Sequence, residues 1–106
     1  GLAAGTTLAA APIAAANPGQ HTVTYQITGP GDAFSIIPDP GASVYPANTN
    51  TWVPLPWTSS VQISGNPYVS LNWTDHSGNH DCIIQVDGKA VPLTEHSPGR
   101  CAYQIP

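Results

Sequence analysis

Charge is the property that this sequence has least of. Charged residues make up 8% of its 106 residues, against roughly a quarter in an average globular protein. Lys89 and Arg100 are the only strong bases, whereas a protein that binds nucleic acid needs several such side chains to neutralise phosphates. The same shortage of basic residues argues against binding to anionic membrane surfaces. We therefore expect no nucleic-acid partner and a polar, weakly charged surface.

The shortage of charge does not indicate a disordered chain. Disordered chains combine high net charge with few aromatic residues, but three Trp, four Tyr and one Phe here supply large side chains that gain by burial. A chain of 106 residues is also long enough for one compact core. We expect a single folded domain over residues 17–106.

Charge is missing altogether from residues 1–16, which are rich in alanine. An apolar stretch ending in Ala14-Ala15-Ala16 is typical of the last part of a secretory signal peptide. The stretch is shorter than the roughly 20 residues of a membrane-spanning helix, and it contains Pro12. We interpret it as a signal-peptide remnant or an apolar N-terminal segment. The expected location is secreted, periplasmic or in the cell envelope, with membrane association through this segment as the alternative.

Cysteine occurs only twice, as Cys82 and Cys101. Export to an oxidising compartment would let the pair persist as a disulfide. Closing a loop of this length should stabilise the fold by about 3 kcal/mol in the chain-entropy model. Metal binding is the weaker alternative, because the sequence shows no further Cys or His at ligand spacing beside them. We predict a disulfide and no cofactor.

The apolar spacing of a helix is absent after the Ala-rich start, and a period of two takes its place. In residues 21–28, Val23, Tyr25 and Ile27 alternate with polar residues, as in a strand with one buried face. Further strands are predicted at 33–37, 42–45, 57–64, 68–74, 82–86, 89–93 and 100–105.

Turn residues separate these predicted strands. Residues 29–32 and 38–41 are rich in Gly, Pro and Asp. We expect 57–64 and 68–74 to form a hairpin, and Asp87-Gly88 to close another. About seven short antiparallel strands favour an all-β, immunoglobulin-like sandwich with one disulfide, with a small open barrel as the alternative.

Several segments match a known family in their order and spacing. They are Tyr25-Gln26-Ile27-Thr28-Gly29-Pro30, Leu55-Pro56-Trp57, Cys82-Ile83-Ile84-Gln85-Val86-Asp87-Gly88-Lys89, and Cys101 close to Tyr103. Together they resemble the mycobacterial MmpS family, the small accessory proteins of MmpL lipid and siderophore exporters.

The resemblance implies an extracytoplasmic sandwich with one disulfide, no active site and a role in supporting a membrane transporter. The implied partner is an envelope or membrane protein, such as an MmpL-type exporter, with a lipid-like cargo as a further candidate. The Ala-rich residues 1–16 stand where family members have an uncleaved membrane helix, so we expect a secreted relative.

Residues 75–81 hold the densest set of chemically reactive side chains, including His76 and His80. Two imidazoles and two carboxylates are ligand types for zinc or copper. The same stretch contains Ser, Gly and Asn, which belong in turns for backbone reasons. The two histidines are therefore weak candidates for metal ligands, and no metal site is predicted.

Motifs for catalysis are missing as well. The sequence contains no G-x-S-x-G and no phosphate-binding glycine loop. The serines have ordinary strand or turn contexts, and no nucleophile with an adjacent base stands out. We expect no catalytic residues and no enzymatic activity.

The tryptophans divide into two groups. Trp57 and Trp73 fall on predicted strands and are expected in the core. Trp52 lies in a proline-rich stretch that cannot pair regularly, which would hold its ring near the surface. We predict that Trp52, Tyr45 and Leu55 contact a partner, although Trp52 could instead fold down to cap the sandwich.

These observations favour a non-enzymatic accessory or interaction domain of the mycobacterial cell envelope that supports a transporter or an envelope complex. The alternative is a secreted module that binds a small molecule, lipid or carbohydrate, which would require a concave aromatic patch.

Overall fold

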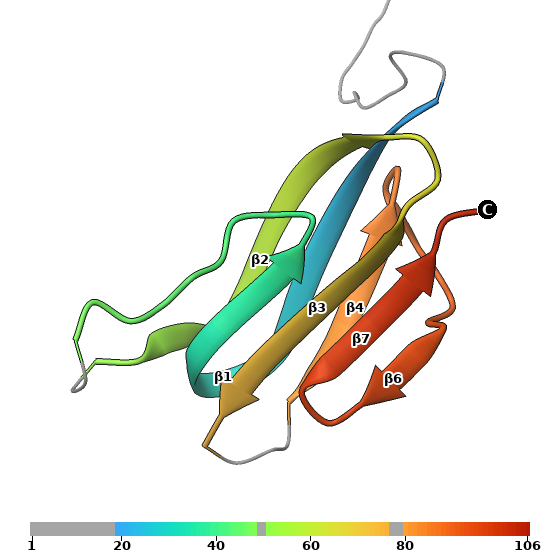
Figure 1. Ribbon diagram of the computed structural model, residues 1–106. Helices are drawn as coiled ribbons and strands as arrows, with labels where there is room; N and C mark the ends of the chain where they lie inside the picture. The colour runs from blue at the N-terminus through green and yellow to red at the C-terminus, as the bar shows by residue number, and fades with distance from the viewer. Residues whose placement is uncertain (1–18, 49–50, 77–79) are drawn as a thin grey trace, which may run out of the picture.

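The computed structural model describes residues 19–48, 51–76 and 80–106, and within these ranges the fold is entirely β (Figure 1). The strands are β1 (Gln20–Asp39), β2 (Val53–Ser64), β3 (Tyr68–Asp75), β4 (Asp81–Val86), β5 (Lys89–Ala90), β6 (Glu95–Ser97) and β7 (Arg100–Gln104). Every strand pairing is antiparallel. The described part of the chain has no helix that could cross a membrane. The predicted signal segment, residues 1–16, lies outside the described residues.

β1 organises the whole sheet because its two halves have different neighbours. Its first half lies between β2 and β4, so that Val23 pairs with Val61 on one side and with Val86 on the other. Its second half pairs with β3, from Ala33 opposite Asp75 to Asp39 opposite Ser70. The strand order is β5-β4-β1-β3-β7-β6, with β2 beside β1.

The sheet curls until β7 lies over β4 (Figure 1). Cys82 on β4 and Cys101 on β7 form the predicted disulfide, with their Cα atoms 6.5 Å apart. An antiparallel all-β fold with one disulfide is therefore confirmed. The curl is compatible with the immunoglobulin-like sandwich that we expect.

Residues 29–32 were predicted to end a strand, but β1 continues through them. Gly29 and Gly31 adopt positive φ angles of 93° and 126°, and the register with β2 shifts between Ile27 and Gly31. Glycine tolerates these angles because it has no Cβ. The irregularity bends the strand without ending it, as a β-bulge does.

The predicted hairpin between 57–64 and 68–74 is wrong. β2 and β3 both pair with β1, and neither pairs with the other. A strand as long as β1 offers two separate pairing segments, and residues 65–67 carry the chain from one to the other. The predicted edge strand at 42–45 is likewise reduced to a single bridge between Ile36 and Val44.

The second predicted hairpin is confirmed. Asp87 and Gly88 connect β4 to β5 with φ angles of 54° and 84°, as a type I′ turn requires. β5 is shorter than the predicted strand at 89–93, and β6 was not predicted at all.

The core lies inside the curl of the sheet. Tyr25 is fully buried, and its hydroxyl donates a hydrogen bond to Pro40 O at 2.8 Å. Burial raises the pKa of Tyr25 far above its ordinary value, with a smaller contribution from the charge of Asp39. Trp73 is in the core as predicted, whereas Trp57 is only partly buried against it. The other fully buried large side chains are Val23, Ile27, Ile36, Val69, Leu71, Ile84 and Cys101.

Candidate functional site

The three predicted contact residues occupy three different environments. Leu55 is only 8% exposed and belongs to the core, so it is not a surface contact residue. Its place in β2 turns it inward, although the prolines on either side suggested a surface loop. Tyr45 is 60% exposed, and Trp52 is half-buried. None of the ring contacts within the described ranges involves Tyr45.

Trp52 lies in a cluster of rings that come from three segments of the chain. Its indole stacks on the imidazole of His76, with ring centroids 3.6 Å apart and planes 11° apart. Phe34 meets the indole edge-on at 5.4 Å, a favourable geometry for aromatic pairs. We call the set of Phe34, Trp52 and His76 the aromatic surface.

The aromatic surface is accessible to solvent. Phe34 is 42% exposed and the His76 side chain 62%. Phe34 points outward because it follows the buried Ala33 on β1. Asp32, two residues earlier, accepts a hydrogen bond from His76 Nδ1 at 2.7 Å and so orients the ring that stacks on Trp52. Phe34 and Asp32 are not among the residues predicted from the sequence, although their two-residue spacing on a strand is a signal that they share a face.

His80 is separated from His76 by burial and by its partners. Its side chain is only 7% exposed. Nδ1 lies 2.9 Å from Asp75 Oδ2, and Nε2 lies 2.6 Å from Pro30 O. Both ring nitrogens are therefore engaged by oxygen atoms of the chain. His80 therefore has no free nitrogen for a metal ion.

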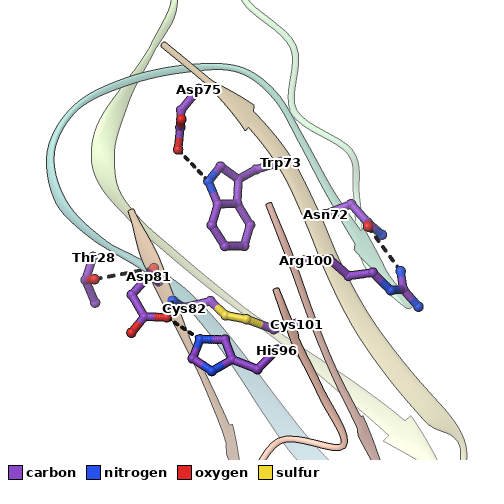
Figure 2. Close-up of a disulfide and its surroundings, with 9 residues drawn as sticks. All are labelled: Thr28, Asn72, Trp73, Asp75, Asp81, Cys82, His96, Arg100 and Cys101. Carbon is purple, nitrogen blue, oxygen red and sulfur yellow. Dashed lines mark hydrogen bonds and ion pairs between the residues drawn. A yellow bond between two sulfur atoms is a disulfide. The ribbon is translucent and has the colours of Figure 1, made fainter. Parts of the chain in front are cut away.

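The buried histidine belongs to a network that we call the interior cluster: Trp73, Asp75 and His80. Trp73 Nε1 donates to the same carboxylate oxygen of Asp75 at 2.8 Å (Figure 2). The imidazole packs against the backbone of Gly29 and Gly31, where a Cβ would come within 3.3 Å and 3.2 Å of the ring. The network thus ties the loop before β4 to the bend of β1.

A third group of side chains lies at the disulfide. His96 on β6 stands beside Cys82 and Cys101, and its Nε2 donates to Asp81 Oδ1 at 2.5 Å (Figure 2). The backbone N–H of Cys82 donates to the same oxygen at 2.8 Å. The hydrogen bond from His96, and after it the one from Cys82, lowers the pKa of Asp81.

His96 is the residue whose position the sequence did not reveal. The sequence analysis found no histidine at ligand spacing near the cysteines, but the β6–β7 hairpin places His96 directly opposite Cys101. The Pro98-Gly99 turn between them was the available signal. Within the described ranges, the group of possible metal ligands that the structure brings together is Cys82, His96 and Cys101, and it includes neither His76 nor His80.

Comparison with known proteins adds no relative. No protein-family model matches the chain, and no curated protein or solved structure matches it either. The resemblance to the MmpS family therefore rests on the segments quoted above, and the function has to be argued from the surface of this chain.

Proposed function

We propose that this chain is a non-enzymatic, extracytoplasmic interaction domain that binds its partner through the aromatic surface. The observation that supports the proposal is the stack of Trp52 on His76 with Phe34 at its edge, outside the core and open to solvent. Aromatic residues are enriched among the few residues that dominate binding energies at protein interfaces.

The rings are held in place before any partner arrives. Phe34 lies on β1 between the paired residues Ala33 and Ser35, and His76 is oriented by its hydrogen bond to Asp32 and by its stack on Trp52. Rings that are already ordered lose less side-chain entropy on binding, so more of the contact energy appears as affinity. The aromatic surface therefore fits a binding role better than a group of loosely attached surface rings would.

The proposed partner is an envelope or membrane protein, with an MmpL-type exporter of the mycobacterial envelope as the first candidate. The exporter follows from the MmpS resemblance, and the binding mode follows from the surface. With so few charged residues, the domain has little means of electrostatic steering, so aromatic contacts would supply most of the affinity.

The test compares two single substitutions in a binding assay with a purified exporter of this type. Trp52→Ala should weaken binding by about 30-fold, the size of a typical hot-spot loss. Tyr68→Ala is the matched control and should bind like wild type, because Tyr68 is an exposed aromatic residue outside the aromatic surface. Equal affinities for wild type and Trp52→Ala would contradict the proposal, provided that thermal melting shows both proteins folded.

The alternative of a small-molecule, lipid or carbohydrate-binding module uses the same surface, since stacked rings also bind sugars and lipid chains. NMR titration with short oligosaccharides and with lipid micelles would distinguish the two. Saturable shifts of the Trp52 indole signal with either ligand, without exporter binding, would replace the first proposal by the second.

A further inference from the structure

Three metal-ligand side chains converge where β4, β6 and β7 meet. Their ligand atoms, the two sulfurs of Cys82 and Cys101 and an imidazole nitrogen of His96, all lie within 4.8 Å of one another. The cysteines are buried, while His96 is half exposed and lies beside them (Figure 2). The group shares no residue with the aromatic surface or with the interior cluster, although Trp73 packs in the same core as the two cysteines.

The backbone already places the three ligands. His96 is paired with Cys101, so the two side chains project from the same face of the sheet. Zinc lies about 2.3 Å from sulfur and about 2.0 Å from nitrogen, so the sulfur and nitrogen ligands of one tetrahedral ion are roughly 3.5 to 3.8 Å apart. Ligand atoms that lie within 4.8 Å of one another can reach that geometry by side-chain rotation.

Asp81 supplies an outer partner for the histidine. Its carboxylate accepts hydrogen bonds from His96 Nε2 and from the backbone N–H of Cys82. With Nε2 donating to Asp81, the lone pair of a neutral imidazole is on Nδ1, and the ring would have to turn to bring Nδ1 toward the sulfurs. A carboxylate that orients a ligating histidine and raises its basicity is a frequent feature of metal sites.

We propose that the dithiol form of this chain binds one thiophilic ion, such as Zn²⁺, through Cys82, Cys101 and His96. A reducing dithiol, for example one of the thioredoxin type, transfers two electrons to the disulfide, becomes a disulfide itself and leaves two protein thiols. Binding of Zn²⁺ then releases two protons as two Zn–S bonds form. The ion and the disulfide exclude each other, so the same cysteines serve either as a covalent link or as a metal site.

The first experiment titrates Zn²⁺ into the full chain after reduction, with the disulfide form as reference. Reduced wild type should bind one equivalent at least about 10-fold more tightly than the disulfide form. His96→Ala should lower the affinity of the reduced form at least about 10-fold. His21→Ala is the matched control, because His21 also bonds to an aspartate, Asp87 at 2.7 Å, but is absent from the ligand group; it should bind like wild type.

The proposal is overturned if the reduced chain binds no more tightly than the disulfide form, or if His96→Ala binds like wild type. If reduction unfolds the chain, circular dichroism provides the test. Zn²⁺ should then restore the β-sheet signal of wild type but not of His96→Ala, because the three ligands come together only when the chain folds. Equal binding in concentrated urea would also overturn it, since that would show two thiolates acting without the structure.

Discussion

The interior cluster and the aromatic surface contain similar side chains in opposite settings. Each has an indole and an imidazole whose partner is an aspartate, Asp75 inside and Asp32 at the surface, and the aromatic surface adds Phe34. The His80 side chain is almost fully buried, whereas most of the His76 side chain is exposed. What distinguishes the two is access to water.

That difference decides what each cluster can contribute. A buried imidazole and carboxylate that lose their partner cannot recover it from solvent, so the pair is costly to break. The exposed pair exchanges its hydrogen bond with water and adds little to stability. The interior cluster is therefore suited to holding the fold, and the aromatic surface is free to contact a partner.

The largest expected effect comes from His80→Ala. The substitution removes the imidazole that bonds to the buried carboxylate of Asp75, and it opens space beside Gly29 and Gly31. We expect the free energy of unfolding to fall by about 3 kcal/mol, measured by urea denaturation. A loss as small as that of His76→Ala would remove the distinction between the two clusters.

A somewhat smaller effect should follow from Gly31→Ala. The new Cβ would lie 3.2 Å from His80 Nε2, at a φ of 126° that alanine rarely adopts. We expect a loss of about 2 kcal/mol. Gly65→Ala is the control: its φ is 77°, but nothing lies within 4 Å of the added Cβ. It should cost about 1 kcal/mol from backbone strain alone, and an equal loss in both variants would show that the packing of His80 against Gly31 contributes nothing.

The interior cluster also shows what the sequence could not predict. The alternation of apolar and polar residues identified the strands, because successive side chains of a strand point to opposite faces of the sheet. Val23, Tyr25 and Ile27, all buried on β1, are an example. Which strands pair depends on contacts between distant segments, and the bend at Gly29 and Gly31 reads locally as a turn. The hairpin between β2 and β3 was mispredicted for this reason.

The candidate sites were limited in the same way. Trp52 could be identified from its proline-rich surroundings, but its ring partners come from distant segments, Phe34 from β1 and His76 from the residue after β3. His76 and His80 are close in sequence, yet their roles differ through burial, which no local pattern reports. His96 approaches the cysteines only because the β6–β7 hairpin forms.

Removing the imidazole of the aromatic surface should have only a small effect on stability. His76→Ala removes an exposed pair with Asp32 and one stacked ring, so the free energy of unfolding should fall by less than about 1 kcal/mol. The melting temperature would be measured together with partner binding. A loss close to that of His80→Ala would show that the aromatic surface is a structural element, and the proposed function would lose its support.

The smallest effect is expected at a fourth histidine–aspartate pair, between His21 and Asp87. The hydrogen bond from His21, followed by the backbone N–H of Thr22, lowers the pKa of Asp87. A carboxylate whose pKa is lower in the folded state stabilises the fold above its unfolded pKa of about 3.9, and the stabilisation is lost as the pH falls through the folded value.

The substitution Asp87→Asn tests this pair because it keeps the turn geometry with Gly88. At neutral pH, the free energy of unfolding of wild type should be higher than that of the variant by less than about 1 kcal/mol. Urea denaturation between pH 7 and pH 2 should show the difference shrinking on acidification; a difference that persisted at the acid end would mean that the turn itself, and not the exposed pair, separates the two proteins.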